Sequence, residues 1–405
     1  MFKRLVILAV VMALALGALA GCGQPEAKKA EVKPEAKPAA APAVTEIHIP
    51  VIAPLSGPQA SGPGKAAQDG AGLAAKLIND KGGIKGQKLV LDWYDDRGDA
   101  SEAAVLAQKV ADNKNYAAVI AHFSSDACFA AMPIYEKAGL PMLTAWASHV
   151  ELTTRSKISF RMSGSTAAYG QLNGDIIVDE LKAKKVGIIL ANAEYHKDHT
   201  KYMKERFTEK KVQIVKEEFY MIGDSDFKPQ LTNIIKAAPD VIAIVGYPRE
   251  VSFIINQART MGWKKPLTIS PGAASQETID LAGKNMTDTY MGASSSALTD
   301  ALKGKPVTNK AAADYLEGFR KEYKKDPAPG GGWEAQSFDV VRVIAQAITK
   351  VGNDRAKVLQ ELTATKDFQG VLGVLFGPDR AMMGDKAYNK FDPKAKEWVV
   401  FKVVK

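Results

Sequence analysis

Hydroxyl and aromatic side chains follow several short apolar runs of the chain, and they are the residues best suited to holding a small solute. Serine hydroxyls at a helix N-terminus suit a carboxylate, because free backbone N–H groups and the helix dipole favour negative charge there. Aromatic rings suit an apolar or flat body and can also cover a cation. The competing interpretation is that the serines are helix caps and the rings are core. The residues in question are Ser56, Ser124, Ser125, Trp146, Ser148, Tyr195, Tyr247 and the loop of Ser270, Pro271 and Gly272.

The motifs of common catalytic and nucleotide-binding sites are missing from the sequence. A glycine-rich stretch at 57–65 lacks the residues that a P-loop needs, and no Gly-x-Gly-x-x-Gly follows the first apolar run. Neither His-Glu-x-x-His nor Gly-x-Ser-x-Gly is present. His196 and His199 lie three residues apart, beside Glu194 and Asp198; they would suit a metal, but a solvated helix start is the simpler interpretation. We therefore expect a protein that is not an enzyme and that needs no metal or cofactor.

Apolar runs alternate with segments of helical periodicity through most of the chain. Strands are predicted at 47–53, 88–94, 117–121, 142–145, 186–190, 212–217 and 241–245. Helices are predicted between them, including 65–79, 101–112 with Ser101 as the N-cap, and 197–210. This alternation indicates an α/β protein with parallel sheets wound on both faces, and two such series suggest two lobes. Ligands of such sheets bind beyond the carboxyl ends of the strands, where the hydroxyl and aromatic side chains lie.

The composition is that of a globular protein. Of the 405 residues, 46% are hydrophobic and 24% are charged, which excludes a disordered chain and a multi-span membrane protein. The 54 Lys and Arg residues exceed the 45 Asp and Glu residues, but they are spread along the chain without an Arg-rich run. Nucleic acid is therefore not expected as a partner.

The N-terminal segment is typical of an exported protein. Lys3 and Arg4 precede an apolar run at 5–20, which is too short for a stable membrane span and fits a signal peptide at 1–21. The sequence Leu-Ala-Gly-Cys at 19–22 resembles the lipobox of bacterial lipoproteins, in which the Cys receives lipid. An ordinary secretory signal with a chance Cys22 is the alternative.

The segment after the signal peptide and the cysteine content are consistent with an exported, lipid-anchored protein. Residues 22–45 are rich in Pro, Ala, Lys and Glu and predict a flexible spacer between a membrane and the globular body. Cys22 and Cys128 are the only cysteines, so a lipid on Cys22 leaves no internal disulfide. We expect Cys128 to be a buried structural residue.

From about residue 47 to the C-terminus, the chain resembles the solute-binding proteins of branched-chain amino-acid ABC importers, which have the type I periplasmic-binding fold. The segments that carry the resemblance are Pro-Leu-Ser-Gly-Pro at 54–58, Ile-Asn-Asp-Lys-Gly-Gly-Ile-Lys-Gly at 78–86, Tyr-Asp-Asp at 94–96, Ile-Tyr-Glu-Lys-Ala-Gly-Leu-Pro at 134–141, Gly-Tyr at 246–247 and Gln-Ala-Arg at 257–259. The resemblance implies two lobes, joined by three crossovers, that close on a ligand. The implied lobes comprise 46–165 with 295–385, and 166–294 with 386–405.

The resemblance also implies roles for the candidate side chains. Ser125 and Ser148 match positions that bind a ligand carboxylate, and Ser124 is adjacent. The aromatic positions are Trp146 as a pocket wall, Tyr195 and Tyr247 as contacts from the second lobe, and Trp333 as the lining of a side-chain pocket.

Three departures from the family pattern bear on the ligand. Leucine-type members carry an acid for the ligand ammonium in the loop where this chain has Gly272, and losing such a buried charged hydrogen bond costs on the order of 2–5 kcal/mol. Trp146 replaces a small residue, and the disulfide of some members cannot form because Gly98 and Ser124 occupy its positions. Glu334 is one candidate for the missing acid. Without a substitute, an aromatic acid or a neutral amide fits better than an amino acid.

The expected function is that of a lipid-anchored, monomeric receptor outside the cytoplasm of a bacterium. It would deliver a small solute to an ABC permease and its ATPase. The alternative is a ligand-sensing module of the same fold that acts in signalling.

Overall fold

The computed structural model describes residues 46–294, 307, 309–327, 332–375 and 386–404. The predicted signal peptide, Cys22 and the tether lie outside these residues. No helix in the described part of the chain is long and apolar enough to cross a membrane.

The first sheet has five parallel strands in the order β2-β1-β3-β4-β5. These strands are β1 (Glu46–Ala53), β2 (Lys88–Asp95), β3 (Val119–Ala121), β4 (Met142–Thr144) and β5 (Ser159–Arg161). The helices of this lobe are α1 (Lys65–Asp80), α2 (Ala100–Asp112), α3 (Ser125–Ala138), α4 (Glu151–Thr154), α11 (Lys310–Tyr323), α12 (Trp333–Val351) and α13 (Arg355–Ala364). A π-helical turn η1 (Ala60–Gly64) and the hairpin of β11 (Phe368–Gly370) and β12 (Gly373–Leu375) complete it.

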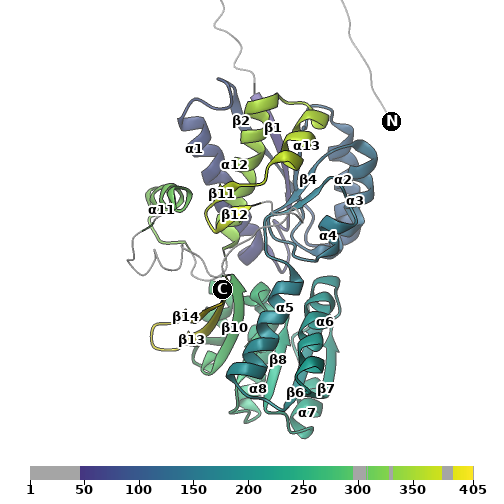
Figure 1. The fold of residues 1–405 in the computed structure, drawn as a ribbon, viewed down its shortest axis with the longest axis vertical. Helices are drawn as coiled ribbons and strands as arrows, with labels where there is room; N and C mark the ends of the chain where they lie inside the picture. The colour runs from purple at the N-terminus through teal and green to yellow at the C-terminus, as the bar shows by residue number, and fades with distance from the viewer. Residues whose placement is uncertain (1–45, 295–306, 308, 328–331, 376–385, 405) are drawn as a thin grey trace, which may run out of the picture. The chain divides into compact units, whose positions relative to one another are not determined.

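Strand β1 is buried because helices cover both faces of the sheet. Ile49 and Val51 belong to the core shared with α1 and α12, which lie side by side in Figure 1. Ile52 points to the other face and packs with the residues of α2 and α3. A nearly continuous apolar strand of this kind is typical of a parallel sheet.

The second sheet has seven strands in the order β14-β13-β10-β9-β8-β6-β7. The parallel strands are β6 (Lys185–Ala191), β7 (Gln213–Tyr220), β8 (Val241–Val245), β9 (Leu267–Ile269) and β10 (Thr289–Ser294), and β13 (Lys386–Asp392) and β14 (Glu397–Val404) add an antiparallel edge. The helical elements are α5 (Thr166–Asp175), η2 (Ile176–Glu180), α6 (Glu194–Glu209), α7 (Lys228–Lys236), α8 (Pro248–Thr260), η3 (Pro271–Ala273), α9 (Gln276–Ala282) and η4 (Gly283–Met286).

The predicted α/β class with two doubly wound lobes is confirmed. The chain passes between the two lobes three times, from β5 to α5, from β10 to α11 and from β12 to β13. Two predicted helix starts are wrong. Asp99, not Ser101, caps α2 by accepting a hydrogen bond of 2.8 Å from the Glu102 backbone N–H, while the Glu102 carboxylate pairs with Arg97 at 2.9 Å. Helix α6 begins at Glu194 rather than 197, which places Tyr195 on its first turn.

Candidate functional site

The loop between β3 and α3 carries the two adjacent serines. Ser124 is the N-cap of α3, and its Oγ accepts a hydrogen bond of 3.1 Å from the Ala127 backbone N–H. Ser125 is 1% exposed, and its Oγ has no hydrogen-bond partner among the described residues. The capping interpretation therefore holds for Ser124 alone. The Ser125 hydroxyl is a buried polar group that still needs a partner.

A buried polar network supports this loop, and the sequence patterns did not reveal it. The Asp96 carboxylate lies 2.8 Å from His122 Nδ1, and His122 Nε2 lies 3.2 Å from the Tyr135 hydroxyl. Asp96 and His122 are both fully buried. The Thr144 hydroxyl also donates to the His122 carbonyl over 3.0 Å. These bonds tie the end of β3 to the residue that follows β2 and to the neighbouring strand β4, immediately before the two serines.

Five aromatic rings from both lobes lie next to the serine loop. Phe123 lies at their centre, with ring centroids 5.4 Å from Tyr247, 5.4 Å from Trp333 and 6.4 Å from Trp146. Tyr195 stacks on Tyr247 at 6.1 Å with an angle of 9° between the rings. The structure thus brings together the four aromatic residues singled out from the sequence. Phe123 was missed because an apolar residue at the end of a strand has the pattern of ordinary core.

Hydrogen bonds within the first lobe fix two of the other candidates. Trp146 Nε1 donates to Ser337 Oγ over 2.9 Å, and Ser337 in turn donates to the Trp333 carbonyl over 2.6 Å. Ser148 Oγ lies 3.2 Å from the Trp146 carbonyl and 3.1 Å from Ser163 Oγ. Helix α12 therefore holds the Trp146 indole in place, and the Ser148 hydroxyl has partners within its own lobe.

Gly272 lies against Tyr195, which explains why residue 272 carries no side chain. The Gly272 backbone N–H donates to the Tyr195 hydroxyl over 3.2 Å. A β-carbon at residue 272 would lie 3.0 to 3.2 Å from the hydroxyl and ring atoms of Tyr195. The charged groups that act on Glu334, the other candidate acid, are Asp69, Lys325 and Lys65, all in the first lobe. The tyrosine thus occupies the place into which an acid at 272 would project.

Placing an acid at residue 272 should therefore be costly. We expect Gly272→Asp to lower the free energy of unfolding by about 1–3 kcal/mol, because the new side chain must displace the Tyr195 ring. Urea denaturation measures this cost. In a Tyr195→Ala background the same change should cost less, because the ring is gone. Equal costs in the two backgrounds would contradict this packing.

The sequence suggested that the two histidines of α6 lie at a solvated helix start. The structure shows that this expectation is wrong. His196 and His199 are both fully buried. The His196 ring contacts Tyr195 and Tyr247 at centroid distances of 4.9 and 4.7 Å, and neither of its nitrogens has a hydrogen-bond partner in the described part of the chain. Burial lowers the pKa of His199 to about 3, and burial together with the neighbouring His199 lowers the pKa of His196 to about 3. The described residues contain no group of three His, Cys, Asp or Glu side chains that could hold a metal.

The two lobes touch beside the aromatic cluster. Both carboxylate oxygens of Asp126, on α3, lie 3.3 Å from the backbone nitrogen of Glu194, which opens α6. The Phe123–Tyr247 contact also joins the lobes. Burial raises the pKa of Asp126, and the Glu194 N–H opposes this by stabilising the charged form. The N-termini of α3 and α6 thus meet at the cluster.

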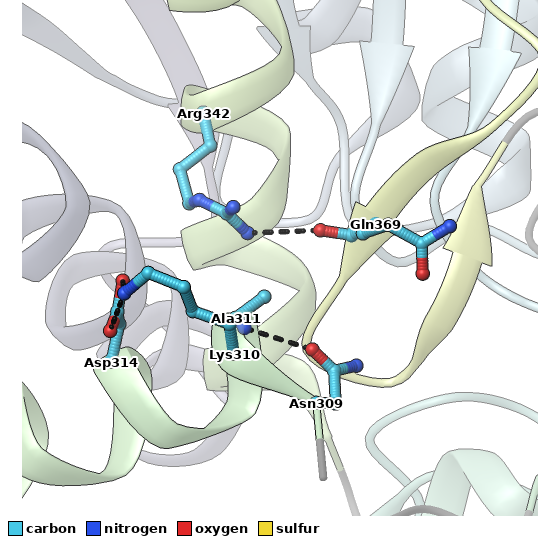
Figure 2. A pocket seen from close by; sticks show the side chains of 6 residues that line it. All are labelled: Asn309, Lys310, Ala311, Asp314, Arg342 and Gln369. Atoms are coloured by element: carbon cyan, nitrogen blue, oxygen red, sulfur yellow. Dashed lines mark hydrogen bonds and ion pairs between the residues drawn. The ribbon is translucent and has the colours of Figure 1, made fainter.

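Two other features do not contribute to this site. Cys128 is fully buried, and burial raises the pKa of its thiol to about 12, so it remains an unreactive thiol. Figure 2 shows a pocket of about 530 Å³ in the first lobe, whose charged groups already have partners. Lys310 pairs with Asp314 at 2.7 Å, and Arg342 pairs with Asp339 at 2.6 Å.

Comparison with known proteins matches most of the described chain to one family. The sequence profile described as periplasmic binding protein matches residues 46–388. An amino acid binding protein of Pseudomonas aeruginosa is 28% identical over 364 residues, which is 88% of this chain and 90% of that protein. Leu/Ile/Val-binding protein homolog 1 of Brucella abortus is 26% identical over 352 residues, 86% of this chain and 88% of that protein.

Solved structures show the same arrangement. The branched-chain amino acid transporter substrate binding protein of Streptococcus pneumoniae, in complex with isoleucine, matches with a TM-score of 0.76 at 27% identity and covers 89% of this chain and 99% of its own. An ABC transporter solute binding protein of R. palustris, in complex with benzoate, matches with a TM-score of 0.78 and covers 88% of this chain and 96% of its own. At 18% identity, the second likeness shows the fold alone.

Proposed function

The chain belongs to the family of periplasmic binding proteins, and we propose that it captures a small solute bearing a carboxylate or amide group between its two lobes. The observation that carries this proposal is the Ser125 hydroxyl, which is buried at the start of α3 and has no hydrogen-bond partner among the residues that the structure describes. A bound carboxylate or amide oxygen would accept its hydrogen bond. The helix N-terminus favours negative charge at the same place.

The aromatic residues would enclose the rest of the solute. Phe123, Trp146 and Trp333 come from the first lobe, and Tyr195 and Tyr247 from the second, so closure of the lobes would complete the wall. Closure of this kind couples binding to a change of shape that a partner can recognise. The solute is then an amino acid, an aromatic acid or an amide. The relatives are named for, or are in complex with, ligands of two of these classes. Leu/Ile/Val and isoleucine are amino acids, and benzoate is an aromatic acid.

We propose that the closed protein delivers this solute to an ABC permease and its ATPase, and that it acts as a monomer without catalysing a reaction. It would lie outside the cytoplasm of a bacterium, held to a membrane by lipid on Cys22. The lobe boundaries at 165, 294 and 385 belong to the same proposal. The second candidate function is that of a ligand-sensing module in signalling. Delivery to a permease is favoured over sensing because the structural relative in complex with isoleucine is named as a transporter protein.

Calorimetric titration of the wild-type protein with leucine, phenylalanine, benzoate and small amides tests the proposal. For a ligand that binds, we expect Ser125→Ala to weaken affinity by about 10-fold, because a buried donor to a charged or polar group contributes about 1–3 kcal/mol. The stability of the unliganded protein should stay the same or rise, since the substitution removes a buried hydroxyl that lacks a partner.

Ser124→Ala is the matched control. Its hydroxyl caps α3, so we expect the free energy of unfolding to fall by about 1 kcal/mol while ligand affinity changes less than for Ser125→Ala. Unchanged affinity in Ser125→Ala would place the site elsewhere. Failure of every amino acid, aromatic acid and amide to bind would reject the proposed function itself.

A further inference from the structure

Helix α6 begins without a capping side chain of its own. Helices α2, α3, α5 and α9 are each capped by an aspartate or serine that directly precedes them. At α6 this position is Ala193, whose methyl group makes no hydrogen bond. The first backbone N–H groups of a helix have no partner within the helix, so the N–H of Glu194 needs an acceptor from elsewhere.

Asp126 of the first lobe provides that acceptor. Both of its carboxylate oxygens lie 3.3 Å from the Glu194 backbone nitrogen. Asp126 is on the first turn of α3, so the carboxylate lies between the N-termini of two helices. Each N-terminus carries a partial positive charge, and a shared carboxylate attracts both where they would otherwise repel each other. In the part of the chain that the structure describes, no cation forms an ion pair with Asp126, and Lys197 stabilises its charge from a greater distance.

This contact depends on the approach of the two lobes, because neither α3 nor α6 adjoins one of the three crossovers. Another acid of α6, Asp198, contacts the first lobe beside the hinge. Its carboxylate accepts a hydrogen bond of 3.3 Å from the Val150 backbone N–H. It also accepts one from the hydroxyl of Thr166, which opens α5 directly after the first crossover. Separation of the lobes about the crossovers would therefore break the Asp126 contact more readily than the Asp198 contact.

We propose that Asp126 is a positioning residue for closure, which caps α6 from the opposite lobe and so gives this helix, in the closed form alone, the N-cap that its own sequence lacks. This inference rests on the proposed function and names a group that stabilises the closed form. Asp126 acts through α6, which carries Tyr195 directly after the capped residue. A captured solute leaves only after the lobes open, so the cap prolongs its retention.

The test separates the two rates of binding in wild type, Asp126→Ala, Asp126→Asn and Glu102→Ala. The probes are leucine, phenylalanine, benzoate and acetamide, and the one that binds wild type most tightly is used for stopped-flow tryptophan fluorescence. We expect Asp126→Ala to release it about 5- to 10-fold faster, as for the loss of a helix cap, with a nearly unchanged association rate because the solute enters the open form. Asp126→Asn should recover part of the retention, since its amide oxygen still accepts a hydrogen bond.

Glu102→Ala is the matched control. Glu102 is an acid on the first turn of α2, and it pairs with Arg97 of its own lobe. We expect this change to leave both rates as in wild type. In urea denaturation without ligand, Asp126→Ala should lose no more stability than Glu102→Ala, because the open protein does not make the contact between the lobes.

Three results would overturn the inference. An unchanged release rate in Asp126→Ala would show that the cap does not hold the closed form, while leaving the proposed capture of a solute intact. A larger loss of stability in Asp126→Ala than in Glu102→Ala, together with a slower association rate, would assign Asp126 a structural role in the open protein. Binding of none of the four probes by wild type would reject the proposed function and this inference with it.

Discussion

Replacing His196 with phenylalanine is expected to make the protein more resistant to acid by several kcal/mol. His196 is fully buried, and its folded-state pKa is about 3 against an ordinary value of 6.5. Below pH 6.5 the unfolded chain binds a proton that the folded protein does not bind. Stability is therefore fully present above pH 6.5 and is lost as the pH falls toward 3. The loss is about 1.4 kcal/mol per pH unit for each such histidine.

The buried acid Asp339 has the opposite effect on the pH dependence of stability in part of the same pH range. Burial raises the pKa of Asp339 to about 6 from 3.8, although Arg342 opposes the rise. Between these two values the folded protein binds the additional proton, so acid stabilises it and offsets one histidine. The total acid dependence is thus a sum of opposing effects, and a wild-type curve alone does not reveal the histidine contribution.

The difference between two matched proteins isolates His196. Phenylalanine keeps a ring between Tyr195 and Tyr247, which His196 contacts at 4.9 and 4.7 Å, but it cannot bind a proton. Urea denaturation at pH 7, 6, 5 and 4 should show the stability of His196→Phe gaining on wild type by about 3 kcal/mol in total. A constant offset between the proteins reflects packing alone. Parallel stability curves across this range would mean that His196 is not buried as a neutral ring.

The sequence revealed the parts of the fold that depend on local patterns. Apolar runs located β1 to β4 and β6 to β8, but not β5, β9, β10 or the strands that follow. The rule that ligands bind beyond parallel strands pointed to Ser125, Tyr195 and Tyr247. The structure brings these residues to neighbouring loops and helix starts. Periodicity alone was less reliable at helix ends. Helix α6 begins at Glu194 behind an alanine that makes no side-chain cap, so its start carried no recognisable residue.

The residues that sequence reasoning missed owe their roles to long-range packing. Phe123 is an apolar residue just after β3, so nothing in its context marked it as the centre of the aromatic cluster. His196 and His199 lie in a strongly polar segment, which predicts exposure, yet both are buried. The two histidines are buried because α6 packs against α5, where Asn173 lies 3.2 Å from His199, and because the Tyr247 ring contacts His196. Such contacts join segments far apart in the chain and leave no local pattern.

Gly70→Ala is expected to disrupt the packing of two helices in the first lobe. Gly70 lies on α1 where this helix crosses α12, and a β-carbon there would lie 2.0 Å from the Glu334 carbonyl oxygen and 2.8 Å from Ser337 Cβ. The backbone oxygen cannot turn away as a flexible side chain could. The two helices must move apart, at a cost of about 3 kcal/mol of stability. Denaturation by urea measures that cost.

The same displacement should impair the site, because α12 carries both Trp333 and the Ser337 hydroxyl that holds the Trp146 indole. We therefore expect Gly70→Ala to bind the wild-type ligand at least about 10-fold more weakly, a change of about 1.4 kcal/mol. Gly72→Ala is the matched control on the same helix, since a β-carbon at Gly72 meets no atom within 4 Å. It should raise stability by about 0.5–1 kcal/mol and leave affinity unchanged, because alanine loses less chain entropy in a helix. Equal effects of the two alanines would contradict the close crossing of α1 and α12, and with it the link between this helix pair and the aromatic wall.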